Sequence, residues 1–256
     1  MKRKMVCFIF VVVMIFSMNS SVFAATKGGV DLGPSGDSMT DKPITIEEQE
    51  NAVLNDRSLS YEEKTRFLQR IQEHKDLING DIITPQVAND PSGSIAVPYF
   101  KQDNSYYCGP ATTKQTVHFI KRTSSSQATI ATAIGTTTAG SNLTDMMTYI
   151  NNNQTRRDYI IVTNPSEDLI QSIVEYSVRN LAPTVCRLKI ATGGNWLYSS
   201  SGHYMNLSAF TNYGANIQVC DPYLGWVTST STGKYYVTSN EIYTATANHF
   251  AHQIMY

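Results

Sequence analysis

Two helices are predicted in residues 41–80, where apolar positions recur at helical spacing among many charged ones. Thr45 followed by Glu48, and Ser60 followed by Glu63, each match a capping box, in which the two side chains bond to each other's backbone N–H groups. Asn79-Gly80 is expected to end the second helix. That helix carries an apolar stripe formed by Phe67, Leu68, Ile71, Leu77 and Ile78. The pattern predicts a helical pair with one face to bury.

Residues 95–256 show helical spacing first and strand-like alternation later. Helices are predicted at residues 108–121, 127–134 and 143–151, and another after Asn164-Pro165, with Asn164 as its N-cap. Strands are predicted at residues 159–162, 184–188, 203–210, 216–220, 234–237 and 249–255, with Gly214 in a turn. Helices followed by an antiparallel sheet form an α+β fold.

Composition supports a globular protein without a strong electrostatic partner. The chain has 256 residues, of which 41% are hydrophobic and 16% are charged, and this excludes a wholly disordered chain. Its 20 Lys and Arg residues nearly balance its 21 Asp and Glu residues. A chain with no basic excess has no electrostatic footprint for nucleic acid or for an anionic membrane.

The N-terminus has the three parts of a secretory signal peptide. Lys2, Arg3 and Lys4 precede an apolar run at residues 5–16, and Ala24 ends a small-residue cleavage site. The run is shorter than the roughly 20 residues that span a membrane, although an uncleaved anchor is the alternative. We expect residues 1–24 to be a signal peptide and the mature protein to be secreted, either extracellular or associated with the cell wall, with no membrane contact after cleavage.

The rest of the chain divides at a linker that contains Pro85, Pro91 and Gly93. Residues 25–94 are predicted to be a charged helical prosegment or spacer with that linker, and residues 95–256 the main domain. The helices of residues 41–80 have three possible roles: they lie over a cleft and inhibit, they pack on the back of the domain, or they act as a spacer from the cell surface.

The first candidate site is the opening of the helix at Cys108. Backbone N–H groups and the helix dipole favour an anion there, which increases the fraction of a thiol present as the nucleophilic thiolate. Gly109 and Pro110 suit a helix start, because the missing N–H of proline would be unpaired in any case. Gln102, six residues earlier, can place an amide donor over the same point and form half of an oxyanion hole.

The second and third candidates are His203, which opens a strand after Gly202, and Asp221, which ends the next one before Pro222. If those strands form a hairpin through residues 212–214, Asp221 lies near His203 and fixes its tautomer. His203 can then act as a base and afterwards as an acid.

Each of these signals has a simpler explanation. A single cysteine is often a small core residue.

A zinc site formed by Cys108, His203 and Asp221 is an alternative, but no Cys-x-x-Cys or His-x-x-x-His pair supports it. Residues 195–201, rich in Tyr, Ser and Asn, either line a cleft for polar ligands or form a solvated loop. The histidines without a partner pattern are interpreted as surface or core residues: His74, His118, His249 and His252.

Taken together, three segments resemble the papain-like double-glycine peptidase family, whose best-known members trim leader peptides in bacteriocin exporters. The resemblance covers residues 95–256, and its segments are Val97-Pro98 through Gln102 to Tyr107-Cys108-Gly109-Pro110-Ala111, Gly202-His203-Tyr204, and Val219-Cys220-Asp221-Pro222-Tyr223. It implies a papain-like fold in which Cys108 is the nucleophile and His203 the general acid and base. Asp221 would orient His203, and Gln102 would donate to the oxyanion.

This resemblance predicts a stand-alone, secreted cysteine peptidase that acts on peptide or protein substrates and needs no cofactor or metal. Two alternatives stay open: the same site used for acyl transfer or deamidation, and a non-catalytic module that binds the cell wall or a partner. A disulfide between Cys186 and Cys220 is also predicted, because they lie in neighbouring predicted strands of an exported protein.

Overall fold

The computed structural model describes residues 36–37, 42–80, 91–230 and 232–256, so the predicted signal peptide lies outside the described residues. The helices are α1 (Ile46–Asn55), α2 (Tyr61–Asn79), α3 (Cys108–Lys121), α4 (Gln127–Ala133), α5 (Leu143–Asn152), α6 (Glu167–Arg179), α7 (Leu224–Val227) and α8 (Ser239–Ala247). The strands are β1 (Gly93–Ser94), β2 (Ile161–Thr163), β3 (Thr184–Ile190), β4 (Ser200–Thr211), β5 (Asn216–Cys220), β6 (Lys234–Thr238) and β7 (Gln253–Met255). Within these residues no helix is long and apolar enough to cross a membrane.

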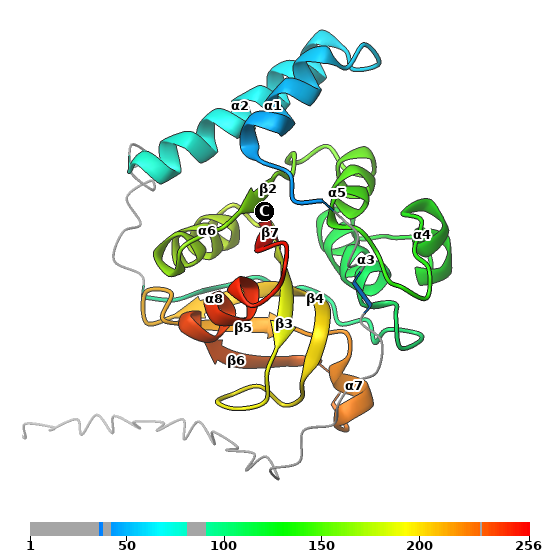
Figure 1. Ribbon diagram of the computed structural model, residues 1–256, viewed down its shortest axis with the longest axis vertical. Helices are drawn as coiled ribbons and strands as arrows, with labels where there is room; N and C mark the ends of the chain where they lie inside the picture. The colour runs from blue at the N-terminus through cyan, green and yellow to red at the C-terminus, as the bar shows by residue number, and fades with distance from the viewer. Residues whose placement is uncertain (1–35, 38–41, 81–90, 231) are drawn as a thin grey trace, which may run out of the picture.

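The described strands form one antiparallel sheet in the order β2-β7-β3-β4-β5-β6, with β1 paired to β4. Helices lie on both sides of it (Figure 1). One apolar cluster joins α3, α4 and α5 to the face of Val185 and Tyr204. A second joins α6 and α8 to the face of Cys186 and Leu188. The predicted α+β fold is confirmed.

The two charged helices, α1 and α2, lie side by side at one end of the molecule (Figure 1). Both capping boxes form as predicted, and α2 ends at Asn79 with Gly80 in the left-handed conformation. In α1, the Gln49 side chain bonds to both backbone groups of Ile161 on β2, at 2.7 and 2.9 Å. In α2, His74 Nδ1 lies 2.7 Å from the Tyr256 hydroxyl. These contacts favour packing on the domain for residues 42–80.

Two predictions for the second half of the chain are wrong. The N-cap of α6 is Ser166, whose hydroxyl accepts from the Leu169 N–H, whereas Asn164 has a φ of 56° in the preceding turn. Helix α8 lies between β6 and β7, so the helices do not all precede the strands and residues 249–252 are not part of a strand. The signal for α8 was present as a capping box between Thr238 and Glu241.

The predicted disulfide between Cys186 and Cys220 is also wrong. Both residues are buried free cysteines, Cys186 on β3 and Cys220 on β5. Strand β4 lies between those strands, since Cys186 is opposite Met205 and Cys220 is opposite Asn206. Two strand spacings amount to roughly 9–10 Å, which exceeds the roughly 7 Å between Cα atoms that a disulfide allows.

Candidate active site

Cys108 is the first residue of α3, as predicted, and its side chain is buried. Polar contacts with β4 hold this helix in place. The Thr112 hydroxyl donates to the Tyr204 carbonyl at 3.0 Å, and the Asn206 amide donates to the Thr112 carbonyl at 3.1 Å. Because Tyr204 follows His203 directly, these bonds hold the start of α3 beside the histidine.

His203 and Asp221 are brought together by the β4–β5 hairpin. The two strands pair from Thr211 opposite Asn216 to Asn206 opposite Cys220, with a turn at residues 212–214. His203 Nε2 lies 2.9 Å from Asp221 Oδ1, and both side chains are buried. The prediction that this hairpin places Asp221 at the histidine is confirmed.

Asp221 is held by a ring of donors that the sequence did not single out. The hydroxyls of Tyr198 and Tyr235 donate to Oδ2 at 2.7 and 3.3 Å, and the Tyr223 N–H donates to Oδ1 at 2.8 Å. The carboxylate is therefore fully bonded where it is completely buried. The one sequence signal for Tyr198 was its place in the Tyr-, Ser- and Asn-containing stretch 195–201, and this residue is buried in the site rather than solvated.

The electrostatics of the pair favour a protonated imidazole. Burial alone lowers the pKa of His203, but the negative charges of Asp221 and Cys108 and their hydrogen bonds to the ring outweigh burial and raise it to about 10. This raised pKa stabilises the folded state in full below about pH 6.5. The stabilisation is lost as the pH rises to about 10. At neutral pH, His203 is thus a cation between two acidic groups.

Gln102 lies next to the Asp221 end of the site. Its backbone N–H donates to the Pro222 carbonyl at 2.9 Å, and its carbonyl accepts from the Trp226 indole at 3.0 Å. The side-chain amide is buried and donates to the Asn104 carbonyl at 2.7 Å. Among the described residues, Gln102 and Cys108 share no hydrogen bond. The backbone therefore brings Gln102 to the site, while its side chain faces Asn104.

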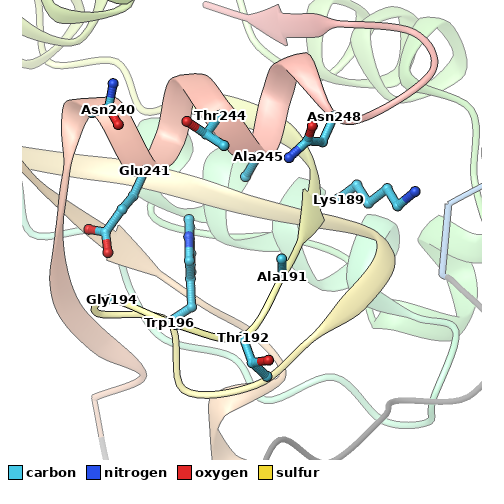
Figure 2. A pocket seen from close by; sticks show the side chains of 11 residues that line it. Lys189, Ala191, Thr192, Gly194, Trp196, Asn240, Glu241, Thr244, Ala245 and Asn248 are labelled. Carbon is cyan, nitrogen blue, oxygen red and sulfur yellow. The ribbon is translucent and has the colours of Figure 1, made fainter.

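A cavity of about 260 Å³ lies elsewhere, between the β3–β4 connection and α8 (Figure 2). Lys189, Trp196 and Glu241 are among its lining residues, and Cys108, His203 and Asp221 are not. Residues 195–201 were predicted either to line a cleft or to form a loop. Of these residues, Trp196 lines this cavity. Among the residues that the structure describes, no group of three or more His, Cys, Asp or Glu side chains is arranged to hold a metal ion.

Comparison with known proteins decides the family. The model of the peptidase C39-like family matches residues 94–250. The chain belongs to that family. This C39-like protein is a cysteine-type peptidase, and its fold is α+β.

Two solved structures resemble this C39-like peptidase. The peptidase domain of Streptococcus ComA, a bifunctional ABC transporter involved in quorum sensing, is 11% identical, with a TM-score of 0.43 over 62% of this chain and 96% of that one. Xylellain, a cysteine protease from Xylella fastidiosa, is 9% identical, with a TM-score of 0.45 over 64% of this chain and 84% of that one. No curated protein matches the chain.

Proposed function

We propose that this chain is a secreted cysteine peptidase that hydrolyses peptide bonds through Cys108, His203 and Asp221. The observation that carries the proposal is the buried His203–Asp221 hydrogen bond of 2.9 Å beside a cysteine at a helix N-terminus. A nucleophile next to a base, with the base oriented by a third group, is the arrangement that covalent catalysis requires. Export is proposed from the signal-like residues 1–24.

In the first half of the reaction, the Cys108 thiolate attacks the amide carbonyl carbon and forms a C–S bond, and the carbonyl electron pair moves to oxygen. The Cys108 N–H and the Gln102 amide donate to that oxyanion. An amide nitrogen has two N–H groups, so the bond from Gln102 to Asn104 leaves one for this role. The C–N bond then breaks as His203 gives its proton to the leaving amine.

In the second half, neutral His203 takes a proton from water, and the resulting hydroxide attacks the thioester carbonyl. The C–S bond breaks, the carboxylic acid leaves, and the thiolate–imidazolium pair returns. Asp221 keeps Nε2 of the ring engaged at 2.9 Å, so that the other ring nitrogen carries the transferred proton. The three donors on Asp221 fix the carboxylate, and the carboxylate in turn fixes the orientation of the His203 ring.

Site-resolved labelling with a peptide-like, thiol-directed electrophile tests this proposal. We expect the folded chain to be labelled at Cys108 in preference to Cys186 and Cys220. Burial raises the pKa of both other thiols, that of Cys220 to about 12, so they stay protonated and unreactive. Mass spectrometry of a tryptic digest locates the label. A folded chain with no preference for Cys108 would instead support a non-catalytic binding module.

A further inference from the structure

Asp37, in the N-terminal segment ahead of α1, lies in a pocket built for a carboxylate. The Arg187 guanidinium donates to it from Nε at 2.9 Å and from Nη2 at 2.7 Å, and the Tyr204 hydroxyl donates at 2.7 Å. His249 Nε2 also contacts this carboxylate. The side chains of Asp37, Arg187 and His249 are completely buried.

The charges in this pocket depend on one another. A buried guanidinium without a partner strongly destabilises the folded state. A carboxylate that accepts two of its hydrogen bonds is therefore the expected ligand of this pocket. Burial raises the pKa of Asp37, but its contacts with His249 and Arg187 outweigh burial and hold that pKa below its usual value. The pocket walls come from β3, β4 and the segment after α8, whereas the carboxylate comes from a residue 150 positions before Arg187.

The residue before Asp37 lies against the candidate nucleophile. A Cβ atom placed on Gly36 would stand 2.5 Å from Cys108 Sγ and 3.2 Å from the Tyr106 carbonyl oxygen. The Gly36 carbonyl accepts from the Ser141 N–H at 3.1 Å, and Asp37 forms a parallel bridge with Ser141. The Gly36 backbone therefore occupies space beside the thiol that a bound peptide would need.

The segment is also tethered close to this position. The Ile44 carbonyl accepts from the Thr163 hydroxyl at 2.8 Å, and α1 follows at Ile46 with Gln49 bonded to Ile161. A ligand joined to its site by a short stretch of the same chain binds at a high effective concentration. This gives the packed helices α1 and α2 a role: they hold residues 36–37 near the site.

We propose that Arg187, His249 and Tyr204 form a subsite for an acidic side chain next to Cys108. Its ligand is an extended peptide in which glycine, lying at the thiol, is followed by aspartate. The chain's own Gly36-Asp37 fills the subsite and competes with peptides that bind in trans. The competition rests on the proposed role of Cys108, whereas the subsite itself rests on the buried carboxylate contacts.

The first test compares the full chain with its Asp37→Asn variant, and with Asp168→Asn as a control of the same charge change on the exposed face of α6. Without the carboxylate, the pocket binds residues 36–37 less tightly, and the segment covers Cys108 less of the time. Iodoacetamide should therefore modify Cys108 at least about tenfold faster in Asp37→Asn and at an unchanged rate in the control. A rate within twofold of the parent would overturn the proposal. If Asp37→Asn does not fold, Gly36→Ala serves the same purpose. Its methyl group collides with the Cys108 sulfur and displaces the segment, so Cys108 should again react faster.

The second test does not use thiol chemistry. Calorimetry measures the binding of the peptide Pro-Ser-Gly-Asp-Ser-Met, the sequence of residues 34–39, and of its Asn analogue, to Asp37→Asn. We expect the Asp peptide to bind at least about tenfold more tightly; equal binding would exclude the subsite. If Cys108 reacts no faster than Cys186 and Cys220 in the parent and in each variant, the proposed function fails. The calorimetric comparison of the two peptides still decides whether the subsite exists.

Discussion

Replacing Cys108 by alanine is expected to abolish peptide hydrolysis and to leave the fold intact. Only a sulfur atom is lost from the start of α3, and the bonds from Asn206 and Thr112 that hold the helix on β4 remain. Removal of a covalent nucleophile typically costs a thousandfold or more in turnover, so we expect a loss of at least about a thousandfold. New peptide termini from a peptide library, counted by mass spectrometry, measure turnover, and circular dichroism checks the fold.

The matched control for this variant is Cys186→Ala. It also removes a buried thiol, but from the core cluster beside α6 and α8 rather than from the helix start. We expect it to keep most of its turnover. Residual turnover of Cys108→Ala within about tenfold of the parent would remove Cys108 from the nucleophile's role.

Replacing His203 by alanine is expected to slow alkylation of Cys108 near neutral pH by at least about tenfold. An adjacent imidazolium stabilises the thiolate, and its loss leaves more of the unreactive thiol at that pH. Asp221 stays bonded to Tyr198, Tyr235 and the Tyr223 N–H in this variant, so the hairpin should keep its fold. The measurement is the alkylation rate of Cys108 from pH 5 to pH 10.

His118→Ala is the control for the histidine variant. His118 lies near the other end of α3, where its ring bonds to the Ser124 hydroxyl at 3.1 Å. Its removal should leave the pH profile unchanged. The same profile for the parent and for His203→Ala would mean that the histidine does not act on the thiol.

The parts of the site that the sequence predicted are those fixed by local rules. Cys108 at a helix start follows from the Gly-Pro that comes after it. The meeting of His203 and Asp221 follows from two alternating strands joined by a short turn, because an antiparallel hairpin brings the start of one strand to the end of the other.

The parts that the sequence did not predict depend on long-range order. The expected Cys186–Cys220 bridge failed because strand order is set by packing, and β4 inserts between their strands. Asp37 stands in a Gly- and Ser-rich stretch that has the composition of a loose leader, and only the folded chain shows its contact with Arg187. His249 was missed for the same reason, since its partner lies more than 200 residues earlier.

A titration of the His203 ring by NMR tests the thiolate–imidazolium pair most directly. Spectra of the parent and of His203→Ala assign the signal, and a third series uses Cys108→Ala. We predict that the ring stays protonated well above neutral pH, with a pKa of about 10 in the parent, and that this pKa falls in Cys108→Ala because one of the two negative charges beside the ring is lost. A ring that titrates near its ordinary value of about 6.5 in both proteins would contradict the pairing of Cys108 with His203.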